Sequence, residues 1–130
     1  MKIVVVIARI LLGLMFFVFG LDVFIHFIPA TPPTAGFAGA FIGALIHSHY
    51  VYFVAAIQLI AGALLLINRF VPLALALLAP VIANILVFHL TMQPEGIPPG
   101  IFAAVLWLVL ASRLRSSFAP LFVQKTALNT

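Results

Sequence analysis

The sequence predicts an all-α integral membrane protein, a four-helix bundle with both termini cytoplasmic and a short extra helix in the first external loop. Only 6% of its 130 residues are charged and 66% are hydrophobic, whereas a soluble domain carries roughly 25% charged residues. The apolar residues gather in four segments near the length of about 20 residues that crosses a bilayer. The charged side chains also separate by sign between the two ends of these segments. Composition, segment length and charge therefore indicate the same architecture.

The first membrane span is expected over residues 3–27. Its apolar run exceeds the roughly 7–15 residues of a signal-peptide core, and no small-x-small cleavage site is evident, so we expect it to remain in the protein. The proline-rich stretch 29–34 then breaks the chain before a second apolar segment at 35–46. Joining that segment to the next span would give a helix of about 48 Å, too long for one crossing. Residues 35–46 are therefore predicted to form a separate external helix, at the interface or re-entrant. Gly39 and Gly43 are expected to pack onto the bundle, with self-association of the chain as the alternative.

Three further spans are expected, at roughly residues 49–67, 70–91 and 97–112. Only Asn68 and Arg69 separate the second span from the third, so these helices should form a tight antiparallel hairpin. The tail 113–130 mixes basic with apolar residues and is expected on the inner membrane surface. The whole chain, residues 1–130, is thus predicted to form a single transmembrane domain.

Charge predicts how the spans are oriented. With the N-terminus inside, all six basic residues fall at the cytoplasmic end: Lys2, Arg9, Arg69, Arg113, Arg115 and Lys125. Both acids, Asp22 and Glu95, fall at the opposite end. Lys and Arg accumulate on the cytoplasmic side of membrane proteins, so we expect a multi-pass protein of the cytoplasmic (inner) membrane. Its positive charge then serves topology and lipid headgroups rather than nucleic acid.

Four polar residues within the spans are candidates for binding a lipophilic cofactor: Arg9, Gln58, Asn84 and His89. Polar side chains are costly in lipid and usually face the bundle interior, a partner or a cavity. Arg9 shares a helix face with Gly13 and Gly20, and this stripe is expected to pack against another helix. The Arg9 side chain either extends to the inner interface or donates to Gln58 or to a ligand. Asn84 is expected to bridge helices or to bind backbone exposed by Pro80.

A second group of polar residues, at the outer end, is predicted to form an external polar cap: Asp22, His26, His47 and His49. Asp22 and His26 are four residues apart, so on a continuous helix both project from one face. This spacing also suits two ligands of one metal. Side chains at the headgroup level are readily satisfied by water, however, and the hydrogen-bonded structural cap is the preferred interpretation. A proton or ligand site without metal is the alternative, and no metal site is predicted.

Motifs for common cofactors and catalytic centres are missing. The sequence has no GxGxxG, no Walker sequence, no HExxH and no CxxCH. It also has no cysteine, which removes disulfides, thiolate metal sites and dithiol chemistry from this chain. No complete catalytic constellation can be assembled, so the sequence does not predict whether the protein is an enzyme.

Two stretches resemble the DoxX-like family of small membrane proteins. Residues 8–20 (ARILLGLMFFVFG), followed by His26 and Phe27, look like the family's first span, and residues 62–90 (GALLLINRFVPLALALLAPVIANILVFHL) are similar to its second and third spans. The resemblance implies a four-helix membrane bundle. Functionally it implies a membrane subunit linked to thiosulfate:quinone oxidoreduction or to oxidative-stress complexes, although distant relatives act as membrane chaperones. It also implies a glutamate in span two, where this chain has Gln58.

Three functions follow as hypotheses. The first is a membrane subunit that binds a quinone or similar redox partner between its helices, because quinone carbonyls need hydrogen-bond donors in an apolar slot. Without a cofactor motif of its own, such a subunit would receive electrons from a partner subunit. The second is a non-catalytic accessory or scaffold subunit, and the third a small oligomeric channel or transporter. Each involves the lipid bilayer and either a membrane protein partner or a second copy of the chain.

Overall fold

The computed structural model describes residues 1–128, and this part of the chain is all-helical, with no strand. Its elements are α1 (Lys2–Ile25), α2 (Gly36–His47), α3 (Tyr50–Leu66), α4 (Val71–Thr91), the 3-10 turn η1 (Pro94–Gly96), α5 (Pro98–Arg113), α6 (Arg115–Phe118) and the 3-10 turn η2 (Ala119–Phe122). The all-α prediction is confirmed, and the helix bounds agree with the expected spans to within two residues. The last two residues of the expected tail, 129–130, lie outside the described residues.

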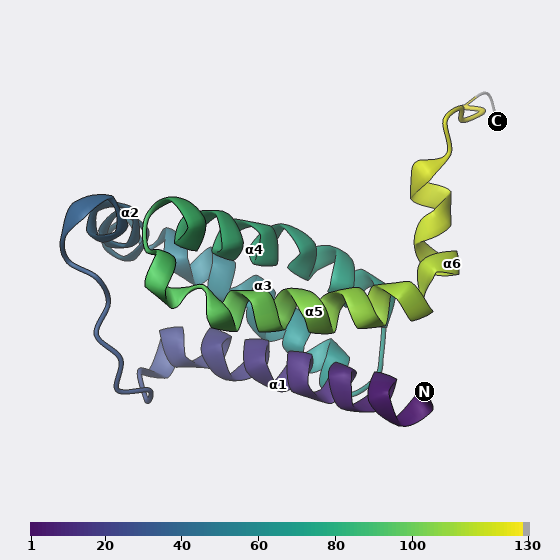
Figure 1. The fold of residues 1–130 in the computed structure, drawn as a ribbon, viewed down its shortest axis with the longest axis horizontal. Coiled ribbons are helices and arrows are strands. Elements are labelled where there is room, and N and C mark those ends of the chain that lie inside the picture. Colours follow the sequence, from purple (N-terminus) through teal and green to yellow (C-terminus); the bar gives the residue numbers. More distant parts are fainter. Residues whose placement is uncertain (129–130) are drawn as a thin grey trace.

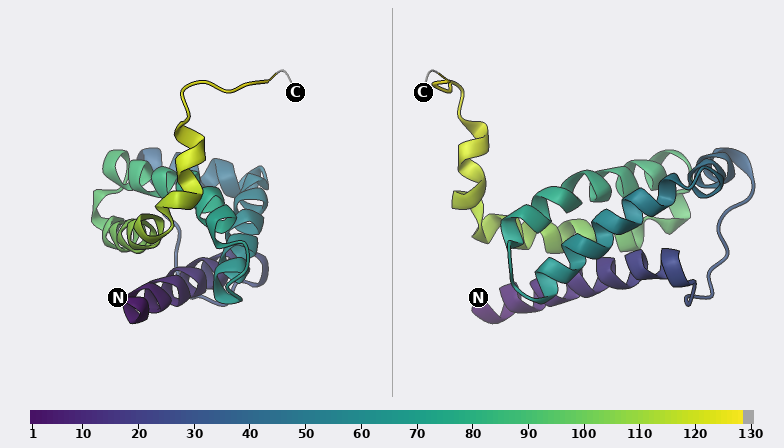
Figure 2. Two further views of the ribbon diagram at one scale, coloured as in Figure 1. Left: turned by 90° about the vertical axis from the view of Figure 1, so that its right-hand side faces the viewer. Right: turned by 180° about the vertical axis from the view of Figure 1, so that it is seen from behind.

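Four long helices lie side by side (Figures 1 and 2). α1 packs against α3 and α5, and α4 packs against the same two helices. Leucines from all four fill the centre and are almost completely buried: Leu12, Leu65, Leu75, Leu78 and Leu110. The outward-facing residues are also apolar, and no polar or charged side chain within residues 1–128 is classed as buried. An apolar core beneath an apolar surface is the pattern of a protein solvated by lipid.

Length and hydropathy qualify two helices, α1 and α4, as membrane spans on their own. Four spans result if α2 with α3, and α5 with α6 and η2, are each counted as one bent segment. α3 has 17 residues and α5 has 16, which gives about 24–26 Å of helix against a hydrocarbon core of about 30 Å. α3 is preceded by α2 and α5 is followed by α6, and the chain bends sharply at both junctions.

α2 is a separate helix, as predicted, and it meets α3 at an angle of 83°. His49, which has a left-handed backbone (φ 67°), makes the corner between the two helices. In Figure 1, α2 therefore lies across the end of the long helices instead of extending α3.

The glycine stripe of α1 packs against α3, as expected. A Cβ added at Gly13 would lie 2.9 Å from Leu65 Cβ, and one added at Gly20 would lie 2.9 Å from the carbonyl oxygen of Ala55. Gly62 of α3 completes the crossing, because its Cβ would lie 2.5 Å from the backbone nitrogen of Phe17. Small residues thus let the two backbones come together.

The expectation that Gly39 and Gly43 pack onto the other helices is wrong. A Cβ at Gly39 would collide with Thr34, in the loop that leads into α2, at 2.4 Å from its carbonyl carbon. A Cβ at Gly43 would meet only His47 of the same helix, at 3.8 Å. α2 is instead joined to α4 by Phe41, whose ring centroid lies 5.4 Å from that of Phe88. Gly39 thus makes room for the loop that folds back onto its own helix, and Gly43 has no comparable close neighbour.

The link between α3 and α4 is a tight turn, as predicted. Asn68 has a left-handed backbone (φ 57°); its N–H donates to Leu65 O at 3.3 Å, and the N–H of Arg69 donates to Leu64 O at 3.0 Å. This pair of bonds is a Schellman cap, in which asparagine is a tolerated substitute for glycine. The cap ends α3 after Leu66 and reverses the chain.

Because successive long helices run in alternating directions, the basic segments lie at one end of the molecule and Glu95 lies at the other. The start of α1, the α3–α4 link and the α5–α6 junction lie together at one end (Figures 1 and 2). These are the segments that carry Lys2, Arg69, Arg113 and Arg115. The α1–α2 loop, α2 and η1, with Glu95, lie at the other end.

Candidate functional site

Three of the four predicted binding residues, Gln58, Asn84 and His89, line one groove between α2, α3 and α4. The groove has a volume of about 530 Å³, within the roughly 300–1,000 Å³ of small-molecule sites. Its other lining residues are almost all apolar: Phe41, Ile42, Leu45, Tyr50, Val51, Phe53, Val54, Ile57, Leu77, Pro80, Val81, Ile85 and Phe88. We call it the outer groove, because it lies toward the end of the molecule that carries α2.

Gln58 projects into the outer groove from the middle of α3. It is half-buried, and none of the side-chain hydrogen bonds found within residues 1–128 involves it. No side-chain nitrogen or oxygen in this part of the chain is both enclosed and unpaired, so the Gln58 amide is accessible from the groove. An amide in an apolar groove offers two N–H donors and one oxygen acceptor to a ligand.

Asn84 lies on the facing side, in α4. Its Nδ2 donates to the carbonyl oxygen of Pro80 at 2.8 Å. Pro80 has no N–H and so leaves the carbonyl of Ala76 without its helical donor. Asn84 thus binds the carbonyl one turn earlier in its own helix and not the freed carbonyl of Ala76, so the expectation that it binds backbone exposed by Pro80 is wrong. One N–H and the side-chain oxygen of Asn84 remain available.

His89 occupies the outer end of the groove in a defined orientation. Its Nδ1 lies 3.0 Å from the carbonyl oxygen of Gln93, and a carbonyl can only accept, so Nδ1 carries the proton and Nε2 presents a lone pair in the neutral ring. The ring meets Phe88 edge-on, with centroids 5.0 Å apart. It also packs on Gly96, where an added Cβ would lie 2.6 Å from Cε1. Three neighbours therefore hold the imidazole.

Arg9, the fourth predicted residue, is outside the outer groove. Its guanidinium donates to the carbonyl oxygen of Leu65 and, at 3.3 Å, to that of Leu66. These carbonyls belong to the last turn of α3, where a cation is favoured by the helix dipole. Gln58 lies seven residues earlier on α3, about 10 Å along the axis. The structure therefore pairs Arg9 with the end of α3 and not with Gln58.

The outer polar residues are held locally. Asp22 Oδ1 accepts from the backbone N–H groups of Phe27 and Ile28, at 2.8 and 2.6 Å. The expectation that Asp22 and His26 share a helix face is wrong, because α1 ends at Ile25 and His26 has a left-handed backbone (φ 50°). Once the helix has ended, the Asp22 carboxylate folds the chain back over its last turn.

The two other histidines of the expected cap also have local neighbours. His47 Nδ1 lies 2.8 Å from Gly43 O, and the His49 ring stacks on Tyr52 with centroids 5.9 Å apart. Across residues 1–128, no three His, Asp or Glu side chains come close enough together to hold a metal ion.

The sequence interpretation did not identify the apolar walls of the outer groove, although the pattern was present. The lining positions of α3 are 50, 51, 53, 54, 57 and 58, and those of α4 are 77, 80, 81, 84, 85, 88 and 89. Both sets follow the i, i+3, i+4, i+7 spacing of a single helix face. In a span that is apolar all round, this face becomes visible only when the neighbouring helices are known.

Comparison with known proteins identifies a family. The model of the family described as DoxX matches residues 4–91, which include nearly all of α1, the whole of α2 to α4 and all three polar residues of the outer groove. No curated protein and no solved structure matches the chain significantly.

Proposed function

Because the chain belongs to the DoxX family, we propose that it is a multi-pass protein of the cytoplasmic membrane, with α1, α3, α4 and α5 as a four-helix transmembrane bundle. Both termini face the cytoplasm in this proposal. The apolar surface and the gathering of basic residues at one end support it. α2 would then lie at the outer interface, and the bend of 84° after α5 would lay α6 and η2 along the inner one.

We further propose that the outer groove binds the head of a quinone or quinol. One observation carries this proposal: Gln58, Asn84 and His89 converge on an apolar groove between three helices. A quinone is an apolar ring whose two carbonyl oxygens accept hydrogen bonds, and its tail is soluble in lipid. Few polar groups in an otherwise apolar site are what such a ligand needs.

Each polar residue has a distinct part in binding. The amide N–H groups of Gln58 and Asn84 donate to carbonyl oxygens of the quinone form. His89 Nε2 accepts from a hydroxyl of the quinol form, since its Nδ1 is already committed to Gln93. A bound quinone would supply the electron-carrying chemistry that this cysteine-free chain lacks, and a partner subunit would exchange electrons with it. The role of this chain is then to bind and orient the ligand.

Quinone affinity of single-site variants tests the proposal. A short-chain benzoquinone is titrated into the purified protein in mild detergent, and binding is followed by thermal stabilisation and by native mass spectrometry. Gln58→Leu removes one hydrogen bond and should weaken binding about two- to tenfold. Gln124→Leu makes the same side-chain change in the C-terminal tail, away from the outer groove, and should leave affinity unchanged. Equal affinity of wild type and Gln58→Leu, or no binding to wild type, would refute the proposal.

A second function, a non-catalytic accessory or scaffold subunit, is favoured by a different observation. Arg9, Asn84 and His89 each already bind a backbone carbonyl of this chain, as residues with a purely structural role would. This alternative requires a stable partner or a second copy. Gentle purification followed by size analysis tests it, and a lone monomer that retains no other chain would exclude it.

A further inference from the structure

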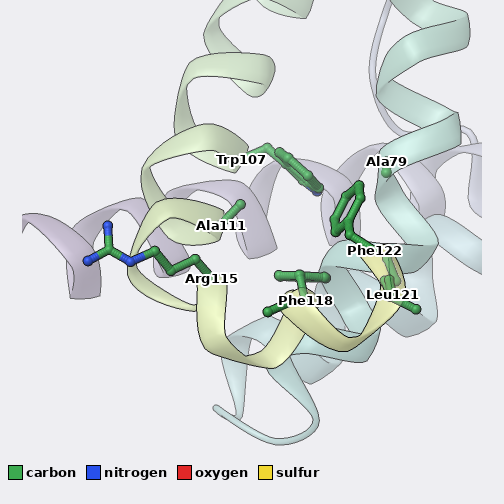
Figure 3. A pocket seen from close by; sticks show the side chains of 9 residues that line it. Ala79, Trp107, Ala111, Arg115, Phe118, Leu121 and Phe122 are labelled. Carbon is green, nitrogen blue, oxygen red and sulfur yellow. The ribbon is translucent and has the colours of Figure 1, made fainter. Parts of the chain in front are cut away.

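A second groove lies at the opposite end of the molecule, where α5 turns into α6. Its volume is about 540 Å³, and α4, α5, α6 and η2 all contribute to its lining. Figure 3 shows Trp107, Phe118, Leu121 and Phe122 gathered around it, with Arg115 at its edge. We call it the inner groove.

The walls of the inner groove present hydrocarbon. The rings of Trp107 and Phe118 lie 6.3 Å apart at a tilt of 40°, and alanines of α4 and α5, including Ala111, keep the space between the helices open. The one polar group of Trp107 is already used, because its Nε1 donates to Leu75 O at 2.8 Å. The groove therefore provides almost no hydrogen-bonding group to a ligand and favours an aliphatic chain.

The sharp bend between α5 and α6 creates this groove. Leu114 ends α5 (φ −109°, ψ 21°), and the next segment leaves at 84°, so that Phe118, Leu121 and Phe122 project beside α4 and α5 instead of continuing the span. Leu121 and Phe122 are 73% and 81% exposed. Such large apolar side chains need a covering of hydrocarbon.

The edge of the inner groove is positively charged. The stem of Arg115 borders the groove, while its guanidinium points away from the aromatic side chains (Figure 3). This is the snorkelling arrangement of basic residues at a membrane surface, with the stem in hydrocarbon and the charge at headgroup level. Arg113, a second basic residue, lies two positions earlier in the chain.

We propose that the inner groove is a binding site for an anionic phospholipid, with one acyl chain in the groove and the phosphate beside Arg115. The apolar walls match the chain, and the local positive charge matches the headgroup. With the orientation proposed above, the lipid belongs to the cytoplasmic leaflet. The site shares no residue with the outer groove, so it stands whether or not a quinone binds there.

Native mass spectrometry of retained lipid tests this site. The protein is exchanged into micelles containing equal amounts of phosphatidylglycerol and phosphatidylcholine, and the bound lipid is identified. Wild type should retain phosphatidylglycerol preferentially. Arg115→Gln should lower that preference about fivefold, the size expected for one basic side chain beside an anionic headgroup. Arg69→Gln removes the same charge at the same end but outside the groove, and should retain the wild-type preference.

A second variant separates the groove from the surface charge. Ala111→Leu reduces the volume of the groove and should lower retention of both lipids while helical content by circular dichroism stays unchanged. The proposal is overturned if Arg115→Gln retains the wild-type preference, if Ala111→Leu retains as much lipid as wild type, or if a second copy of the chain occupies this face in place of lipid.

Discussion

Most polar side chains of this chain hydrogen-bond to backbone groups. The sequence could therefore predict the helix face on which such a residue lies, but not the backbone group that it binds. Side-chain spacing correctly predicted that Arg9 lies on the helix face that packs. It could not show that the acceptors of Arg9 are the carbonyls of Leu65 and Leu66, because every residue has a carbonyl and only the fold decides which carbonyls lie within reach of the guanidinium. Likewise, the sequence could not show that Trp107 donates to the carbonyl oxygen of Leu75.

The Asp22 carboxylate stabilises the end of α1. It accepts two backbone N–H groups beyond the end of α1, so Asp22→Ala should destabilise the fold by about 1–2 kcal/mol. Asp22→Asn keeps an oxygen acceptor in the same place and should lose much less. Thermal unfolding of both variants in one detergent makes the comparison. If the alanine variant melts with the asparagine variant and wild type, Asp22 has no structural role.

At the scale of the helices, hydropathy predicted the number and nearly the bounds of the elements. It could not locate the end of α1 to the residue, since the left-handed turn at His26 replaces a helical turn without any Gly or Pro to mark it. Glycine spacing was informative only where a second helix lies opposite. The stripe of Gly13 and Gly20 packs as predicted, whereas Gly39 and Gly43 have the right spacing but no partner helix.

This contrast gives a matched pair of variants. Gly62→Ala places a Cβ 2.5 Å from the backbone nitrogen of Phe17, and backbone cannot yield as a flexible side chain can, so stability should fall by about 1–3 kcal/mol. Gly43→Ala meets nothing closer than 3.8 Å and should be neutral or stabilising by up to about 1 kcal/mol through helix propensity. The melting temperatures of the two variants, each compared with wild type, measure this difference. Similar losses in both variants would contradict the α1–α3 crossing described above.

The distribution of charge predicts how the whole protein is oriented across the membrane more directly than any single contact does. The chain has no cysteine, so single cysteines can be introduced without background. Glu95→Cys should react with a membrane-impermeant maleimide on intact cells, whereas Ser116→Cys should react only after the membrane is opened. The reverse pattern would place the termini outside, and labelling of both on intact cells would contradict α5 as a membrane span.

The candidate site was predictable only in part, because its groove exists only once several helices have packed together. The sequence identified Gln58, Asn84 and His89 because polar residues stand out in apolar spans. It also grouped Arg9 with them, since depth along a helix does not tell which neighbour a long side chain meets. The groove itself needs three helices in place, and α2 completes it only through the corner at His49.

Photolabelling shows directly whether the outer groove holds a quinone. The protein is reconstituted in liposomes, labelled with a photoreactive short-chain quinone, digested and sequenced by mass spectrometry. We predict adducts on residues 50–58 of α3 and 80–89 of α4, which disappear when unlabelled quinone is in excess. Adducts confined to the inner groove, or spread over the lipid-facing surface without competition, would contradict the claim.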